Sequence, residues 1–215
     1  DKYASCYMWG TLGIVYNPEY ITKEQAAHWD ILLDPSVYKQ VTIKDSVRDA
    51  YFAGNAIYNY DLLMSEEFRN SDDYFARLDE VLNATDSTTV DDIEAMLSEA
   101  QKNVYSFETD AGKADMVTGK VYANQQWSGD AVYTLDQAEE DGLELCYSAP
   151  EEATNLWFDG WCMLDKGIGG DADKQMAAEA FVNFMARPDN AIRNMYYIGY
   201  TSSIAGVTDG LISDY

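Results

Sequence analysis

The chain has 215 residues, of which 47% are hydrophobic and 13% aromatic, enough for the core of one large domain or two modest ones. Its 38 Asp and Glu residues against 14 Lys and Arg residues give a formal net charge of -24. This charge repels nucleic-acid phosphates and anionic lipid surfaces, so no nucleic-acid partner is expected and cations are favoured. An acidic composition can also reflect solubility alone, so the charge by itself does not identify a ligand.

The residues that usually carry metal or cofactor chemistry are scarce. Three cysteines and one histidine are too few and too scattered for a disulfide framework or a zinc site. The sequence has no P-loop, no dinucleotide-binding glycine motif and no nucleophile elbow. We therefore expect no metal and no cofactor. The longest apolar stretch, residues 7–16, is too short to span a bilayer.

Strand and helix patterns alternate along the first half of the chain. Residues 6–16 and 40–45 have the pattern of strands. Ser46 is placed to cap the helix that follows, with Asp49 at its third position, where a carboxylate complements the helix dipole. A second helix is predicted to end near residue 104, with Thr89 as its cap and one apolar face.

The second half continues in the same way. It contains predicted strands at residues 104–108, 120–126 and 143–149, a helix from Ser128, a strand at 156–161, a glycine-rich turn at 166–173, and two helices separated near Pro188, the last capped by Asp189. Strands interleaved with helices predict an α/β layered fold. Ligands of such folds gather at loops outside the strand ends.

Three motifs with polar groups lie at such junctions: residues 45–49 (DSVRD), 125–131 (QQWSGDA) and 156–161 (LWFDGW), and the last two contain aromatic residues. In the last motif, the alternation of a strand puts Trp157, Asp159 and Trp161 on one face. A buried carboxylate without a partner is costly, so Asp159 must face water or a cation.

The order of the motifs resembles the spermidine/putrescine-binding proteins of bacterial ABC transporters. The motifs that carry the resemblance are YMWGTLGIVYN, DSVRDAY, QQWSGDA, LWFDGW, FMARPDNA and IGYTSS, and they run from Tyr7 to about Ser203. The resemblance implies a periplasmic-type (type II) solute-binding fold, in which a hinge joins two α/β lobes. In that family the WGTLGIVYN strand crosses from the first lobe into the second. We therefore expect this chain to lack most of its N-terminal lobe.

The resemblance also implies how the chain is divided. Residues 1–152 correspond to the C-terminal α/β lobe, entered through a hinge strand. Residues 153–203 correspond to a hinge strand and to helices that return to the N-terminal lobe, and residues 204–215 begin the return segment. The apolar helix face with Phe181 and Phe184 would then need a cover: the remaining lobe, a second copy, or a separate chain carrying the missing half.

The function implied is that of the substrate-binding component of an ABC importer, acting outside the cytoplasm, in the periplasm or at the outer face of the membrane. Such a protein holds a polyamine between its lobes, closes about the hinge and delivers the polyamine to a membrane permease. The implied ligand-binding positions are Asp49, Trp127, Trp157, Asp159 and Tyr200, together with Ser46, where some relatives carry a second carboxylate.

The chemistry of these residue types suits such a ligand. A polyamine alternates ammonium groups with methylene chains, so a complementary site alternates carboxylates with aromatic walls. Two alternatives stay open. The same fold could bind another solute, such as an amino acid, a sugar or a metal-anion complex, because Ser46 replaces an acid and fold does not determine ligand. A hydrolase using paired carboxylates is less favoured, and we expect no enzymatic activity.

Overall fold

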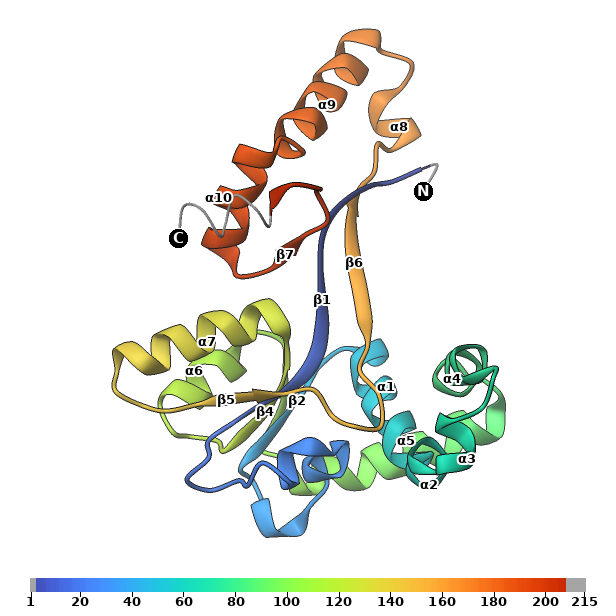
Figure 1. Cartoon of the computed structure of the whole chain (residues 1–215), viewed down its shortest axis with the longest axis vertical. Helices are drawn as coiled ribbons and strands as arrows, with labels where there is room; N and C mark the ends of the chain where they lie inside the picture. Colours follow the sequence, from blue (N-terminus) through green and yellow to red (C-terminus); the bar gives the residue numbers. More distant parts are fainter. Residues whose placement is uncertain (1–2, 208–215) are drawn as a thin grey trace. The chain divides into compact units, whose positions relative to one another are not determined.

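The computed structural model describes residues 3–207 and divides the chain into two compact units. Unit 1 comprises Asp1–Thr11, Ser128–Asp130 and Leu156–Tyr215, and unit 2 comprises Leu12–Trp127 and Ala131–Asn155. Strand β1 (Ser5–Tyr16) and helix α7 (Ser128–Glu140), both labelled in Figure 1, contribute residues to both units. The predicted assignment of residues 1–152 and 153–203 to different lobes stays a prediction. Of the predicted return segment 204–215, residues 208–215 lie outside the described residues.

Unit 2 is built on a sheet with the strand order β3-β2-β4-β1-β5. Strand β2 (Val41–Lys44) pairs in parallel with both β3 (Ser106–Glu108) and β4 (Ala123–Trp127). The second half of β1 is antiparallel to β4 and to β5 (Cys146–Ser148). All four residues of β2 are buried, as expected for a central strand covered on both faces. The α/β architecture predicted from the alternation of strands and helices is confirmed.

Two hydrophobic clusters lie on the two faces of this sheet. Residues of β1 alternate between them: Ile14 and Tyr16 belong to the larger cluster, and Val15 belongs to the smaller one. The larger cluster contains residues of α1 (Val47–Tyr58) and, packed against it, of α5 (Ser87–Asn103), while the smaller contains residues of α6 (Ala111–Val117) and α7. The remaining helices of unit 2 are Gln25–Ala27, Trp29–Leu32, Pro35–Val37, α2 (Tyr60–Met64), α3 (Glu66–Arg69) and α4 (Tyr74–Leu82).

The helix caps confirm one sequence prediction and correct two. The Ser46 hydroxyl accepts a hydrogen bond from the Asp49 N–H at 3.3 Å and caps α1 as predicted. Helix α5 is capped by Asp86 instead of Thr89, because the Asp86 carboxylate accepts from both the N–H and the hydroxyl of Thr89. The last helix begins at Pro188, whose fixed φ and missing N–H suit the first helical position, so Asp189 lies inside the first turn.

Unit 1 is smaller and pairs the first half of β1 with β6 (Leu156–Trp161) and β7 (Thr201–Ser202), both antiparallel. Within the described residues, unit 1 also contains the helices α8 (Asp165–Ile168), α9 (Ala172–Met185) and α10 (Pro188–Ile198). The segment predicted as a glycine-rich turn overlaps the short helix α8, whose C-cap Gly169 has a left-handed φ of 62°. Glycine adopts this conformation without the strain of a side chain.

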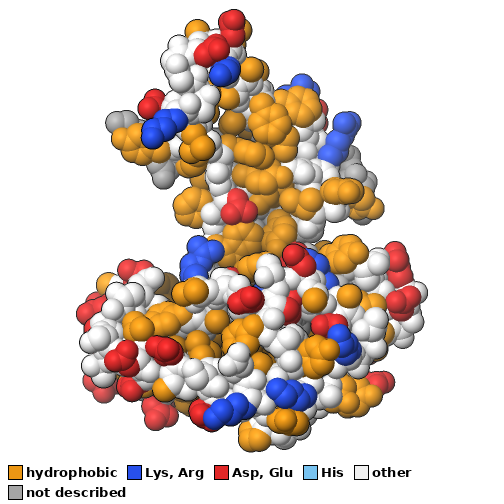
Figure 2. Space-filling view, turned by 180° about the vertical axis from the view of Figure 1, so that it is seen from behind, with side chains coloured by type: hydrophobic (Ala, Val, Ile, Leu, Met, Phe, Trp, Pro, Cys, Tyr) orange, Lys and Arg blue, Asp and Glu red, His pale blue; other side chains and the backbone are white. Residues whose placement is uncertain are grey.

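Large hydrophobic side chains are exposed on unit 1 and gather on one of its faces (Figure 2). Helix α9 buries none of its residues; Phe181 and Phe184 are 49% and 53% exposed, and Leu156 and Phe158 of β6 are 70% and 63% exposed. Apolar faces of this kind usually contact another surface, and which surface covers this one stays a prediction. Within residues 3–207, no helix combines the length and the apolar character needed to cross a membrane.

Candidate functional site

Trp157 of β6 is held against β1 by a glycine. Gly10 is its register partner, and a Cβ atom at Gly10 would lie 2.6 Å from Trp157 Cζ2 and 2.7 Å from Ser128 Oγ. Only glycine leaves room for the indole and the hydroxyl at this point. Ser128, the first residue of α7, accepts a hydrogen bond from the Thr11 N–H at 3.1 Å. The Trp157 Nε1 is buried, with no hydrogen-bond partner among the described residues.

Tyr200 lies beside this tryptophan in the same unit. The ring centroids of Trp157 and Tyr200 are 5.2 Å apart and the ring planes form an angle of 67°, an edge-to-face contact. Gly199 ends α10 with a φ of 75° and turns the chain toward Tyr200. Tyr200 also contacts Gly129, where a Cβ atom would overlap the tyrosine ring. Glycines at positions 10 and 129 therefore make the space that these two aromatic residues fill.

Two carboxylates lie near the Tyr200 hydroxyl. Burial raises the pKa of Tyr200, and the negative charge of Asp130, with which its side chain is hydrogen-bonded, raises this pKa further. The charge of Asp159 raises the pKa of Tyr200 in the same direction. Asp159 itself is exposed, so its carboxylate is accessible to water, and its contact with a cation stays a prediction. The hydroxyl is consequently protonated at neutral pH and lies in a negative environment.

Unit 1 thus brings together Trp157, Asp159 and Tyr200, three of the residues predicted from the sequence, and adds one that the prediction missed. Asp130 lies in the predicted QQWSGDA motif, in the first turn of α7. Its position three residues after Trp127 was a signal that could have singled it out. We define these four residues, Asp130, Trp157, Asp159 and Tyr200, as the acidic aromatic cluster.

The other predicted residues belong to unit 2. Asp49 is only 1% exposed, and its Oδ1 has no hydrogen-bond partner among the described residues. Its backbone carbonyl accepts a hydrogen bond of 3.0 Å from Gln125 Nε2, which ties α1 to β4. Ser46 contributes the cap of α1 described above. A buried carboxylate oxygen without a donor is costly, which makes Asp49 a candidate for contact with a cation.

Trp127, at the end of β4, is half-buried against the larger hydrophobic cluster of unit 2. Its ring has a cationic neighbour that the sequence analysis did not single out. The ammonium group of Lys44, at the end of β2, lies 4.7 Å from the ring centroid. Lys44 is completely buried, and its Nζ lies 3.3 Å from Glu108 Oε1. A lysine at the end of a short strand rich in β-branched residues was the available signal.

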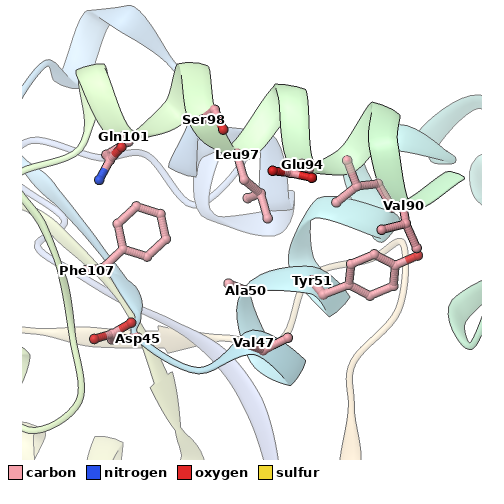
Figure 3. Close-up of a pocket in the computed structure, with 11 residues that line it drawn as sticks. Asp45, Val47, Ala50, Tyr51, Val90, Glu94, Leu97, Ser98, Gln101 and Phe107 are labelled. Carbon is pink, nitrogen blue, oxygen red and sulfur yellow. The ribbon is translucent and has the colours of Figure 1, made fainter. Parts of the chain in front are cut away.

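A groove of about 690 Å³ lies between α1 and α5 (Figure 3). Apolar side chains such as Ala50, Leu97 and Phe107 line it, together with the exposed carboxylates of Asp45 and Glu94. None of the predicted ligand-binding residues is among its lining residues. The groove is therefore separate from the residues on which the functional argument depends.

Comparison with known proteins identifies the family of this chain. Residues 1–214 match the family of bacterial extracellular solute-binding proteins. The chain belongs to this family. It is 24% identical to the putrescine-binding periplasmic protein PotF of Escherichia coli over 97% of its own length and 53% of that protein. It is 23% identical to the spermidine/putrescine-binding periplasmic protein 1 of Haemophilus influenzae over 94% of its length and 48% of that protein.

A solved structure agrees with these relatives. The chain resembles the spermidine/putrescine ABC transporter substrate-binding protein PotD of Streptococcus pneumoniae with a TM-score of 0.71 and 27% identity, covering 97% of this chain and 55% of that one. The family predicted from the ordered motifs is thereby confirmed. The chain spans about half the length of the curated relatives that it matches.

Proposed function

We propose that this chain is part of the substrate-binding component of an ABC importer for polyamines. The observation that carries the proposal is the acidic aromatic cluster of unit 1, where two carboxylates lie near the protonated hydroxyl of a tyrosine whose ring contacts an indole. Relatives named for binding putrescine and spermidine support the ligand class.

Each member of the cluster offers one kind of contact to such a ligand. Asp130 and Asp159 can accept hydrogen bonds from an ammonium group, and charge-assisted bonds of this type are the stronger ones in proteins. The Tyr200 oxygen can accept a further bond while its proton remains on the Asp130 side. The rings of Trp157 and Tyr200 offer dispersion to methylenes and about 0.5 to 2 kcal/mol of cation-π attraction to an ammonium group.

Unit 2 contains the other residues that the proposal concerns. The buried Asp49 oxygen without a donor would gain a hydrogen bond and a counter-charge from an ammonium group. Trp127 would contact the methylene chain, and Ser46 would act through the cap that orients α1. Because several of the proposed contacts are carboxylates, a ligand carrying two or more positive charges is favoured over a neutral sugar or a zwitterionic amino acid.

The proposed role is binding and delivery, without catalysis. The relatives are binding proteins, and two of them are named as periplasmic. We therefore place the site of action outside the cytoplasm, with a membrane permease of the ABC class as the partner that accepts the ligand. The face of unit 1 that exposes Phe181 and Phe184 would be covered by the other half of the binding protein or by a second copy.

Calorimetric titration of the full-length protein with putrescine, spermidine, a neutral sugar and an amino acid tests the proposal. We expect binding of the two polyamines with dissociation constants in the micromolar range or tighter and no heat from the sugar or the amino acid. Binding of the sugar or the amino acid in preference to both polyamines would assign the fold to another solute. Turnover of any of these compounds would contradict a pure binding role.

A further inference from the structure

Lys44 is a fully buried lysine whose ammonium group is held by three neighbours in unit 2. Its Nζ lies 3.3 Å from Glu108 Oε1, donates to the Thr109 carbonyl at 2.6 Å, and lies 4.7 Å from the centroid of the Trp127 ring. A buried ammonium group needs such partners, because desolvation without them is costly. The position of this charge is therefore determined by the fold and does not depend on any ligand.

The groups around Lys44 are themselves held in place. Glu108 accepts hydrogen bonds from the Gly112 N–H at 2.8 Å and from Asn124 Nδ2 at 2.9 Å. The Lys44 N–H donates to Gln125 Oε1 at 3.0 Å, and Gln125 in turn donates to the Asp49 carbonyl. Lys44 cannot move away from Trp127 without leaving Glu108 buried and uncompensated.

The charge on one side of an indole changes what the ring offers to a ligand. The attraction of a cation to an aromatic ring comes from the ring quadrupole. At Trp127 the ammonium group of Lys44 already makes this interaction. A second ammonium group brought to Trp127 would also be repelled by the first across the thickness of the ring. A methylene chain is affected neither by the lost cation-π attraction nor by the charge repulsion, because it contacts the ring through dispersion.

We propose that Lys44 is a specificity-determining residue: its ammonium group makes Trp127 an apolar wall for the methylenes of the ligand, and disfavours amines with additional charges at this position. The proposal rests on the proposed function, in which Trp127 contacts a polyamine. In unit 2, the Asp49 oxygen would then bind an ammonium group of the ligand, and the Trp127 indole would contact the methylene chain between the charges.

The test removes the charge pair in the full-length protein with the double variant Lys44→Met/Glu108→Gln, which leaves no uncompensated charge behind. Calorimetry with butylamine, putrescine and spermidine should show that the double variant binds these amines more tightly than the wild-type protein does. The gain should increase with the charge of the ligand, from a small gain for butylamine to about 3- to 10-fold for spermidine. Unchanged or weaker binding of all three amines in the folded double variant would overturn the proposal.

The chain offers a matched control pair. Lys120 also lies 4.7 Å from an aromatic centroid, that of Tyr105, and forms a 2.9 Å ion pair with Asp115. The variant Lys120→Met/Asp115→Asn removes the same charges and should leave all three affinities unchanged. An equal gain in both double variants would assign the effect to general electrostatics and would overturn the specific role of Lys44.

A second variant tests the same idea without touching the buried pair. Trp127→Leu keeps an apolar side chain, so we expect the same fold-loss of affinity for butylamine, putrescine and spermidine. A loss that grows with ligand charge would show that the indole binds a cation and would overturn the proposal. Failure of the wild-type protein to bind any of the amines would reject the proposed function, and this inference with it; binding that the substitutions at Lys44 leave unchanged rejects the inference alone.

Discussion

Gly129 lies directly against the ring of Tyr200, so that any side chain at position 129 would occupy space that the tyrosine fills. This contact joins the first turn of α7 to the second residue after α10, and the adjacent Asp130 hydrogen-bonds with Tyr200. The closeness of glycine to tyrosine thereby sets the distance between the hydroxyl and the carboxylate of the acidic aromatic cluster.

Gly129→Ala should displace Tyr200 and weaken polyamine binding. The added methyl group overlaps the ring, and overpacking of this kind costs about 1 to 3 kcal/mol of stability. Calorimetry and thermal unfolding of the variant measure both effects. Gly167→Ala in α8 is the control, because a Cβ there makes only an ordinary contact of 3.6 Å with Leu164. Wild-type affinity and stability in Gly129→Ala would contradict the described packing.

Asp159→Asn should lower polyamine affinity by about 10- to 100-fold, because it removes a charge-assisted hydrogen bond to an ammonium group. Asp159 is exposed in the ligand-free chain, so the melting temperature without ligand should change little. Asp173→Asn, at an exposed position in the first turn of α9, is a control of equal charge and should leave affinity unchanged. The reverse pattern, a lower melting temperature with normal affinity, would mark Asp159 as structural.

The variant Tyr200→Phe distinguishes the contribution of the Tyr200 hydroxyl to binding from the contribution of its ring. The variant keeps the edge-to-face contact with Trp157 and loses the hydrogen bond to Asp130. We expect a loss of affinity of about 3- to 10-fold, the usual effect of one hydrogen bond. Because burial and two carboxylates raise the pKa of Tyr200, wild-type binding should show no titration of this hydroxyl between pH 6 and pH 9. Isothermal titrations across that range measure it, and a step present in wild type but absent in Tyr200→Phe would refute the assignment.

Glu152 gives a prediction for stability against pH. It is almost fully buried in unit 2, its Oε1 accepts from the Trp29 N–H at 3.2 Å, and burial raises its pKa above the usual 4.5, although His28 opposes the shift. The folded state then keeps the proton at pH values where the unfolded state has lost it. The contribution of Glu152 to stability is therefore present below about pH 4.5 and is lost as pH rises through the folded-state pKa.

Glu152→Gln should remove this loss, because glutamine keeps the acceptor for Trp29 and carries no charge. The variant should unfold at a higher temperature than wild type at pH 7, and the difference should shrink as the pH approaches 4.5. Thermal unfolding at several pH values measures this, with the exposed neighbour Glu151→Gln as the control. A difference that grows on acidification would show that the carboxylate is stabilised in the folded state.

Local signals in the sequence determined much of this protein. The alternation of strand and helix patterns predicted the α/β fold, the placement of Ser46 before Asp49 predicted the cap of α1, and the ordered motifs predicted the family. The fold pattern and the cap depend on residues that are close in the chain, where hydrophobic period and capping chemistry act directly, whereas the family follows from the order of motifs along the chain. The same local reasoning failed at Thr89 and Asp189, because Asp86 and Pro188 compete for the helix starts.

Only the tertiary structure decided which charges and rings meet. The contact of Tyr200 with Gly129 and Asp130, and the position of the Lys44 ammonium group at Trp127, join residues from distant parts of the chain. Such pairs depend on strand register and on the packing of helices over the sheet, which no local pattern encodes. For that reason the resemblance found in the sequence predicted Trp127 and Tyr200 as ligand contacts, whereas only the fold revealed their neighbours. Trp127 lies beside the buried ammonium group of Lys44, and Tyr200 lies beside the carboxylate of Asp130.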